Sequence, residues 1–421
     1  MTAPEMISMG CRLNIAESET LRQNLLASDI DGDNLIIVNS CAVTNEAVRQ
    51  TRQTIRRVKK ANPDKNIIVT GCAAQVDPAM FAAMPETSAV VGNGDKYDVA
   101  NFKLGLQSNR PDIRVSDIMR ITETTPHMVS AFADRSRAFV EIQNGCDHRC
   151  TFCIIPFGRG NSRSVPAGVV VDQVQQLVDK GFQEVVLTGV DVTSYGPDLP
   201  GTPTLGMLIE RIMRHVPSLP RLRLSSLDGI EIDDRLFALL TEEPRLMPHV
   251  HLSLQSGDNM ILKRMKRRHS REQAIELVER LKAKRPEIAI GADIIAGFPT
   301  EDQTMFANSL SIIEQCDIVH GHIFPYSPKQ GTPAARMPQV DGQIIKSRAK
   351  ILRKSVEQRG RSWLRSMVGS QQSMLAEMSG DAGYCENFAR IRLDEPAGKG
   401  QVVPVDIIGT DEKQLIGRIA A

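Results

Sequence analysis

Apolar runs alternate with amphipathic stretches in the first part of the chain and predict α/β structure. Residues 35–38 and 66–69 are short β-branched runs, and residues 44–60 between them have a helical pattern. A second helical pattern follows Asn14. Strands and helices that alternate at this spacing are typical of a parallel sheet, so we expect an N-terminal α/β domain over residues 1–110.

Six further apolar segments follow, separated by stretches with a helical pattern such as 169–180 and 261–284. The apolar segments cover residues 139–143, 184–190, 221–227, 249–255, 290–297 and 318–326. Repeated βα units predict a partial barrel of six units, (β/α)6, in place of the usual eight. We expect this domain over residues 132–355, and we expect the aperiodic stretch 111–136 to be a linker.

The chain ends with a very basic helical stretch at 344–365 and with short β patterns that glycines separate. The β patterns cover residues 371–378, 389–393, 402–408 and 414–419. They predict a small antiparallel β-barrel over residues 356–421, a fold that often binds oligonucleotides, with a structural end cap as the alternative. The expected fold class is therefore α/β, with a parallel N-terminal sheet, a partial (β/α)6 barrel and a small C-terminal β-barrel.

The composition is that of a globular protein without a membrane span, and it does not by itself indicate a function. Hydrophobic residues make up 41% and charged residues 24% of the 421 positions, as in a globular chain. No apolar run reaches the roughly 18 residues of a membrane span, and the N-terminus lacks a secretory pattern, so no membrane partner is expected. Eight scattered cysteines without a secretory pattern indicate a reducing cytoplasm, where close thiols usually bind metal. Cys316 and Cys385 have no such neighbours and are expected to be structural.

Three of the cysteines, Cys11, Cys41 and Cys72, recur at intervals of 30 and 31 residues. Each lies just after an expected strand, and one βα unit separates each pair. Because ligands gather at the carboxyl ends of the strands in such sheets, we expect the three thiols to converge there. The alternative is that they are buried as small apolar residues, as free cysteines often are.

Three more cysteines form the spacing Cys146-x3-Cys150-x2-Cys153 after the first expected barrel strand, at the end where barrel active sites lie. A structural zinc site would need a fourth ligand, and His148 lies within the loop. Three thiolates on a four-iron cluster would instead leave one iron open to chelate a small molecule. The spacing favours the cluster, and zinc is the alternative.

The sequence of this loop, CDHRCTFC, resembles the cluster loop of radical S-adenosylmethionine enzymes, with Phe152 beside the last cysteine. The resemblance implies that Cys146, Cys150 and Cys153 hold a [4Fe–4S] cluster whose open iron binds S-adenosylmethionine. It also implies reductive cleavage of that cofactor to a 5′-deoxyadenosyl radical, with electrons from a reduced donor of the flavodoxin or ferredoxin type.

The order of the three domains is similar to that of the methylthiotransferases. By this resemblance Cys11, Cys41 and Cys72 hold a second [4Fe–4S] cluster, a sulfur donor is required, and the C-terminal barrel is an RNA-binding TRAM domain. Gly10-Cys11-Arg12-Leu13-Asn14 and Leu187-Thr-Gly-Val-Asp-Val-Thr-Ser-Tyr-Gly196 resemble the branch that acts on threonylcarbamoyladenosine next to the tRNA anticodon. The implied reaction adds a methylthio group to C2 of that nucleoside. The isopentenyladenosine branch and a non-catalytic iron–sulfur RNA-binding protein are the alternatives.

The same resemblance implies further cofactor contacts at the ends of the barrel strands. Gly189-Val190-Asp191 stands where many radical enzymes have a Gly-Gly-Glu segment that meets the substrate amine, with one glycine kept and Asp in place of Glu. Later strands end in Ser225, Gln255 and Ile294, which are expected to face the nucleoside, with ordinary barrel packing as the alternative. The segment 326–333 matches the family's segment after the sixth strand. No side chain is assigned as a catalytic acid or base.

Basic residues cluster on three helical stretches although Lys and Arg (51) nearly balance Asp and Glu (50). The clusters lie at 49–60, 263–268 and 346–365. Solvated helix faces are the usual explanation, but an expected RNA-binding barrel nearby favours phosphate contacts that position tRNA without reading its sequence. The RNA-binding residues that we select are Arg353, Lys354, Arg361 and Arg365.

Overall fold

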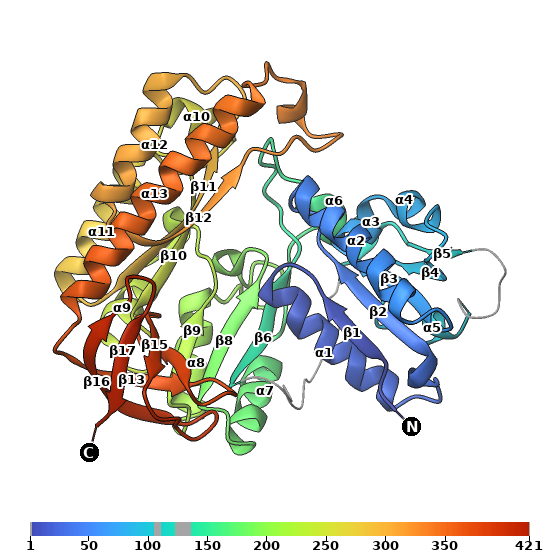
Figure 1. Ribbon diagram of the computed structural model, residues 1–421, viewed down its shortest axis with the longest axis horizontal. Helices are drawn as coiled ribbons and strands as arrows, with labels where there is room; N and C mark the ends of the chain where they lie inside the picture. The colour runs from blue at the N-terminus through green and yellow to red at the C-terminus, as the bar shows by residue number, and fades with distance from the viewer. Residues whose placement is uncertain (1, 105–110, 123–135, 421) are drawn as a thin grey trace.

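The computed structural model describes residues 2–104, 111–122 and 136–420, and it has three parts that follow one another along the chain (Figure 1). An N-terminal α/β layer, at the right of Figure 1, lies beside a central partial barrel, and a small closed β-barrel lies at the lower left. The predicted fold class is confirmed. Among the described residues, no helix combines the length and the apolar character that crossing a membrane requires.

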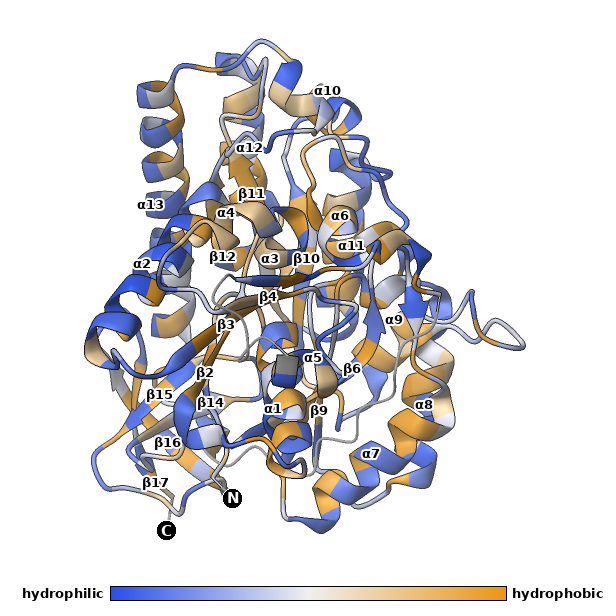
Figure 2. Cartoon of the chain, turned by 90° about the vertical axis from the view of Figure 1, so that its right-hand side faces the viewer, coloured by the Kyte–Doolittle hydropathy of each residue, from blue (hydrophilic) through white to orange (hydrophobic). Residues whose placement is uncertain are grey.

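The N-terminal part is a parallel sheet with strand order β1-β2-β3-β4-β5. Its strands are β1 Glu5–Ser8, β2 Leu35–Ser40, β3 Asn66–Gly71, β4 Ala89–Val91 and β5 Asp112–Arg114. Its helices are α1 Arg12–Leu26, α2 Asn45–Ala61, α3 Cys72–Val76, α4 Pro78–Ala82 and α5 Ala100–Leu104. Alternate residues of β2 pack on opposite faces: Ile36 contacts the α2 side and Ile37 the α1 side, so the strand is buried throughout. Figure 2 shows the hydrophobic residues of β2 and β3 and the mainly hydrophilic residues of α2.

Two strands of this sheet were not expected from the sequence. β4 and β5 have three residues each, which is too short for a hydrophobic period to emerge. β5 lies in the stretch 111–136 that we expected to be a linker, and it pairs with β4 as the edge of the sheet. The linker prediction is therefore wrong for residues 112–114, and residues 123–135 of that stretch lie outside the described residues.

The central part has six parallel strands with helices on their outer side (Figure 1). The strands are β6 Arg137–Asn144, β8 Glu184–Gly189, β9 Arg221–Leu224, β10 His249–Gln255, β11 Ala289–Ala296 and β12 Ile318–Pro325. The helices between them are α6 Ile155–Arg159, α7 Ala167–Asp179, α8 Leu205–His215, α9 Asp234–Glu242, α10 Asn259–Arg264, α11 Arg271–Lys284 and α12 Gln303–Gln315. The β6-β8-β9 and β10-β11-β12 sheets are joined by the bridges Leu222–Leu246 and Leu227–Leu252. The short strand β7 Arg163–Ser164 pairs antiparallel with β6.

The single helix expected over 261–284 is two helices in the structure. The chain leaves α10 at Met265, and Lys266 takes a φ of +58°. Ser270 then begins α11 with a capping box to Gln273. The residues in the break are basic and have good helix propensity, so composition alone gave no reason to expect it.

The C-terminal part is a closed five-stranded barrel that follows the long helix α13 Gly342–Ser366. Its strands are β13 Gln371–Ala376, β14 Ala382–Cys385, β15 Arg390–Leu393, β16 Val402–Thr410 and β17 Leu415–Ile419. The expected antiparallel pairing is found except between β15 and β17, which run parallel. The sequence missed β14, a four-residue strand interrupted by Gly383. Arg221 Nη2 donates to Ser373 O at 2.9 Å, so this barrel docks at the amino ends of the central strands.

Candidate active site

One cysteine-rich loop begins where β6 ends. Gly145 makes the turn with a φ of +72°, and a Cβ there would lie 1.9 Å from the carbonyl oxygen of Asn161, so this position requires glycine. Thr151 N donates to Met265 O at 3.1 Å, which ties the loop to the end of α10. The loop cysteines are Cys146, Cys150 and Cys153.

The loop cysteines are largely removed from water, which disfavours their thiolate form. Burial raises the pKa of Cys146, and it raises the pKa of Cys153 to about 12. Such thiols stay protonated unless a cation holds them as thiolates, as iron does in a cluster. Arg267 Nη1 lies 3.7 Å from Cys150 Sγ and adds positive charge. Three sulfur atoms on one short loop therefore fit a cluster with one open iron.

His148 lies within this loop and contacts two carboxylates. Its Nε2 atom lies 2.9 Å from Asp191 Oδ2 and 3.6 Å from Glu231 Oε1. Hydrogen bonding to Asp191 and then to Glu231 raises the pKa of His148 to about 10. Because Nε2 of His148 faces these two carboxylates, the geometry disfavours His148 as the fourth ligand of a structural zinc site with the loop cysteines.

Gln143 joins the ends of β6 and β8 beside the loop. Its Oε1 atom accepts hydrogen bonds from Val190 N at 3.0 Å and from Asp191 N at 2.8 Å. A Cβ at Gly189 would lie 2.6 Å from Gln143 O, which explains the retained glycine. Asp191 Oδ2 lies 3.7 Å from Cys146 Sγ, so the turn predicted to bind cofactor borders the loop cysteines. The sequence had not singled out Gln143.

The other predicted pocket residues have different surroundings. Phe152 packs edge-on against Phe298, with ring centroids 6.3 Å apart. Ile294 is wholly buried in the barrel core, so packing accounts for it. Ser225 Oγ is buried and has no hydrogen-bond partner among the described residues. Gln255 has a φ of +70° at the shift in register between β10 and β11, so Ser225 and Gln255 have features of a ligand site.

The N-terminal cysteines form a second site. Cys11 follows β1, Cys41 follows β2, and Cys72 begins α3 after β3. A Cβ at Gly10 would lie 2.9 Å from Cys41 Sγ, so the glycine lets the turn after β1 approach that thiol. Burial, and then the charges of Cys72 and Cys11, raise the pKa of Cys41 to about 11. The N-terminal cysteines, Cys11, Cys41 and Cys72, therefore lie near one another, and their role as one metal site stays a prediction.

A buried ion cluster connects the two cysteine sites. Arg159 is the last residue of α6, the short helix that follows the loop cysteines. Its Nε atom lies 3.1 Å from Cys72 Sγ. Its guanidinium also donates to Glu17 at 2.8 and 3.0 Å and to Asn14 at 2.6 Å. Lys96 Nζ pairs with the same Glu17 at 2.8 Å. Sequence reasoning missed this cluster, because a single arginine gives no sign of a contact with residues so distant along the chain.

The segment 326–333 lies at the junction between the barrel and the N-terminal domain. Asn45 donates from its backbone N to Ser327 Oγ and from Nδ2 to Pro328 O, both at 3.1 Å. Lys329 is 8% exposed, and burial lowers its pKa while the charge of Cys41 opposes that effect. This segment therefore borders the N-terminal cysteines.

The predicted RNA-binding residues on α13 differ in their contacts. Arg353 donates to Ile323 O at 3.1 Å. Arg361 pairs with Glu412 at 3.1 Å, and Arg365 pairs with the same carboxylate. Lys354 is exposed and forms no hydrogen bond or ion pair within the described part of the chain. Lys354 is thus the most available of the four for a phosphate.

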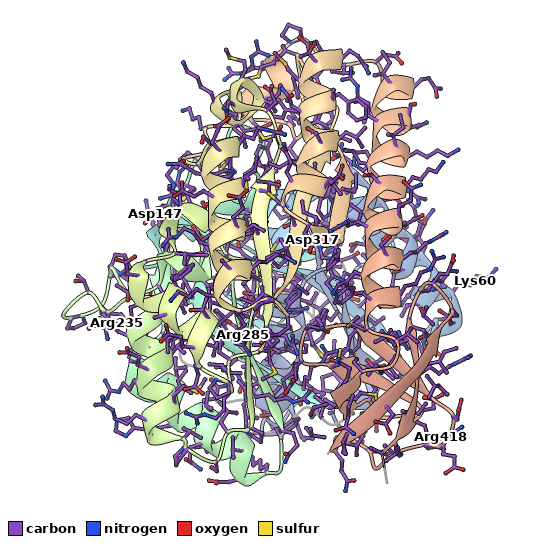
Figure 3. The ribbon with its side chains drawn as sticks, turned by 90° about the vertical axis from the view of Figure 1, so that its left-hand side faces the viewer. Lys60, Asp147, Arg235, Arg285, Asp317 and Arg418 are labelled. Carbon is purple, nitrogen blue, oxygen red and sulfur yellow. The ribbon has the colours of Figure 1, made fainter. Side chains whose placement is uncertain are left out.

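The other two basic clusters also differ in accessibility. On α2, Lys60 extends from the surface (Figure 3). In the cluster at 263–268, Arg267 and Arg268 both donate to Asp228, at 3.0 and 3.1 Å. Arg267 therefore forms its contacts within the protein, beside the loop cysteines, and is not available to RNA. Cys316 and Cys385 are buried in the cores of the central and C-terminal parts.

Comparisons with known proteins identify the family. Residues 140–312 match the family model of the radical SAM superfamily, and residues 5–92 match the uncharacterized protein family UPF0004. The threonylcarbamoyladenosine tRNA methylthiotransferase MtaB of Rickettsia prowazekii is 50% identical over 408 residues, which cover 97% of this chain and 95% of that protein. The chain belongs to the radical S-adenosylmethionine methylthiotransferases.

Further relatives of this methylthiotransferase agree with that assignment. The MtaB protein of Bacillus subtilis is 36% identical, with 81% of this chain and 77% of that protein covered. The tRNA-2-methylthio-N(6)-dimethylallyladenosine synthase of Roseobacter denitrificans is 30% identical, with 99% of each covered. The radical methyltransferase TsrM of Kitasatospora setae shares the fold, with a TM-score of 0.51, 16% identity, and coverage of 77% of this chain and 68% of that one. By its family, the enzyme uses S-adenosylmethionine and [4Fe–4S] clusters.

Proposed function

We propose that this methylthiotransferase adds a methylthio group to C2 of N6-threonylcarbamoyladenosine beside the anticodon of tRNA. The observation that carries the proposal is the 50% identity, over 97% of the chain, to a protein named for that activity. The relative named for dimethylallyladenosine is 30% identical over the whole chain, which makes isopentenyladenosine the second candidate.

We assign the loop cysteines to the radical cluster and the N-terminal cysteines to the auxiliary cluster. Each set offers three sulfur atoms, and the two remaining cysteines, Cys316 and Cys385, lie in hydrophobic cores, which suits two four-iron clusters with one open position each. Bound there, the clusters and S-adenosylmethionine supply the radical and sulfur chemistry. Two such sites favour an enzyme over a non-catalytic iron–sulfur carrier.

The residues of the chain itself position the two sites. Gln143 fixes the Val190–Asp191 turn against the loop cysteines through two hydrogen bonds. Arg159 fixes Cys72 relative to the same loop, because only a short helix separates Arg159 from Cys153. The Arg159 and Glu17 side chains are 3% and 1% exposed, so water is excluded on this side of the N-terminal cysteines.

We propose that the C-terminal part is a TRAM-like RNA-binding domain. A groove of about 620 Å³ lies between β12, α13 and the C-terminal barrel. Trp363 and Tyr384 line it together with Arg361, Arg390 and Lys413, a mixture of aromatic and basic side chains that suits unstacked nucleotides.

Other expectations stay predictions. They are the domain limits 132–355 and 356–421, with β5 added to the N-terminal domain, and the location in the cytoplasm. A reduced flavodoxin- or ferredoxin-type electron donor and a sulfur donor are the proposed partners besides tRNA.

The test is mass spectrometry of tRNA nucleosides from a strain that lacks the gene. We expect loss of 2-methylthio-N6-threonylcarbamoyladenosine, accumulation of its unmethylthiolated precursor, and recovery by the wild-type gene. Loss of the isopentenyl product alone would instead favour the second candidate, and an unchanged nucleoside profile would contradict both.

A further inference from the structure

Three arginines from two parts of the chain surround one phenylalanine from the third part. The guanidinium carbons of Arg12, Arg137 and Arg223 lie 5.4, 5.3 and 4.8 Å from the centre of the Phe388 ring. Arg12 begins α1, Arg137 and Arg223 lie on β6 and β9, and Phe388 connects β14 to β15. Phe388 has a φ of +70°, a costly backbone conformation for an aromatic residue that often marks a functional site.

The positive charge of these three arginines exceeds the negative charge of the carboxylates beside them. The guanidinium of Arg223 already has partners for its N–H donors. It donates to Glu184 at 2.9 and 3.1 Å and to backbone carbonyls of the C-terminal barrel. Arg12 forms no hydrogen bond or ion pair with any described residue, and its contact is with the Phe388 ring. Arg137 pairs with Glu377 at 3.9 Å, and the charge of Glu184, beside it on β8, also acts on it. Arg12 and Arg137 therefore keep N–H donors for an anion.

Two imidazoles, those of His249 and His320, border the same ring and have ring nitrogens without hydrogen-bond partners among the described residues. The ring centroids of His249 and His320 lie 5.0 and 6.0 Å from that of Phe388. His249 is 5% exposed, and neither of its ring nitrogens has a hydrogen-bond partner among the described residues; the same holds for Nε2 of His320. Burial lowers the pKa of His249, so its ring is neutral and can both donate and accept. Unpartnered buried polar atoms are costly, and a polar ligand would satisfy them.

We propose that Arg12 and Arg137 bind the carboxylate of the substrate's threonylcarbamoyl group, with His249 and His320 placed to hydrogen-bond the polar atoms beside it. The inference rests on the proposed function. A threonylcarbamoyl group carries a carboxylate and a hydroxyl, whereas an isopentenyl group carries neither, so this site would select between the two nucleosides. Arg12 directly follows Cys11, with Cα atoms about 3.8 Å apart. The anion site is therefore adjacent in the chain to a cysteine of the proposed auxiliary site.

An RNA phosphate would offer the same anionic oxygens, so the test must separate the two sources. Two anticodon stem-loops are compared that differ only in carrying threonylcarbamoyladenosine or unmodified adenosine. Their dissociation constants are measured by fluorescence anisotropy with the cluster-loaded full-length protein. The variants are Arg12→Gln, which removes the charge, and Arg12→Lys, which retains it without the forked donors. The exposed Arg214 on α8 supplies the matched control Arg214→Gln.

The proposal expects Arg12→Gln to weaken binding of the modified loop about tenfold or more, as loss of a charge-assisted hydrogen bond does, and to leave the unmodified loop unchanged. Arg12→Lys should lose less, and Arg214→Gln should behave as the wild type. Equal weakening of both loops would assign the site to a phosphate and overturn the proposal, as would unchanged affinity for both. Iron content is measured for every variant. If Arg12→Gln loses iron, Arg137→Gln, which lies outside the cysteine motifs, takes its place with the same expected outcomes.

The same samples separate this inference from the proposed function. If the wild-type enzyme converts the modified loop to its methylthio product and Arg12→Gln and Arg137→Gln keep full selectivity for that loop, the carboxylate site alone is wrong. If the wild-type enzyme does not convert the modified loop but converts an isopentenyladenosine loop, the proposed function and the inference both fail.

Discussion

Arg159 is the residue through which the two cysteine sites are held together, and Arg159→Met tests that role. The side chain is 3% exposed and bonds to Glu17, Asn14 and Cys72 Sγ. Methionine of similar length removes the charge and every one of these contacts, and it leaves the buried Glu17 with Lys96 as its cationic partner. Because Lys96 still neutralises Glu17, the loss comes from the charge-assisted hydrogen bonds of Arg159, and we expect the free energy of unfolding of the N-terminal part to fall by about 1.5–3 kcal/mol.

The assay combines urea unfolding of the apo protein with iron analysis after anaerobic reconstitution. Wild-type protein is expected to hold about eight irons in two four-iron clusters, and Arg159→Met about four, because the N-terminal cysteines lose their cationic neighbour. Arg245 offers a matched control, since it also pairs with a carboxylate and with several backbone carbonyls but contacts none of the cysteines of either site. Arg245→Met should lower stability and keep full iron content. Wild-type stability and about eight irons in Arg159→Met would refute the reasoning.

Four further outcomes are expected. Replacing all the loop cysteines with alanine should leave about four irons by iron analysis and abolish reductive cleavage of S-adenosylmethionine; full iron content would show that the loop is misassigned. Replacing all the N-terminal cysteines should retain that cleavage and lose methylthio product by mass spectrometry, and product at the wild-type rate would make these cysteines structural. Burial opposes ionisation of Asp293, but hydrogen bonds from His251 and His322 outweigh it and lower its pKa from 3.8 to about 2. Its carboxylate therefore stabilises the fold above pH 4 and loses this effect as pH falls through 2, so apo wild type should lose about 2 kcal/mol more than Asp293→Asn between pH 5 and 2 in urea unfolding. Lys354→Gln should reduce the slope of log affinity for tRNA against log salt by about 0.7 to 0.9, and an unchanged slope would exclude a phosphate contact there.

The sequence was informative where local pattern determines structure. β2 and β3 were expected because their β-branched runs are buried on both faces, a pattern that holds without knowledge of their neighbours. Convergence of the N-terminal cysteines followed from one topological rule, since parallel strands place their carboxyl ends at one edge. The cysteine loop was informative because its spacing lies within eight residues and does not depend on tertiary contacts.

Contacts between distant segments could not be predicted. Arg159 and Glu17 are 142 residues apart, and no hydrophobic period relates them. Arg267 was grouped with basic residues expected to contact RNA phosphates, but the break between α10 and α11 turns it toward Asp228 and Cys150. The ring of Phe388 contacts arginines from two other parts of the chain. These contacts depend on how the C-terminal barrel docks on the amino ends of the central strands.

The most direct test of the central claim is anaerobic turnover by the reconstituted enzyme on synthetic anticodon stem-loops. One loop carries threonylcarbamoyladenosine and the other isopentenyladenosine, and both are supplied with S-adenosylmethionine, a reductant and a sulfur source. Mass spectrometry of the digested nucleosides should show a methylthio product from the threonylcarbamoyl loop and none from the isopentenyl loop. A methylthio product from the isopentenyl loop alone would contradict the account.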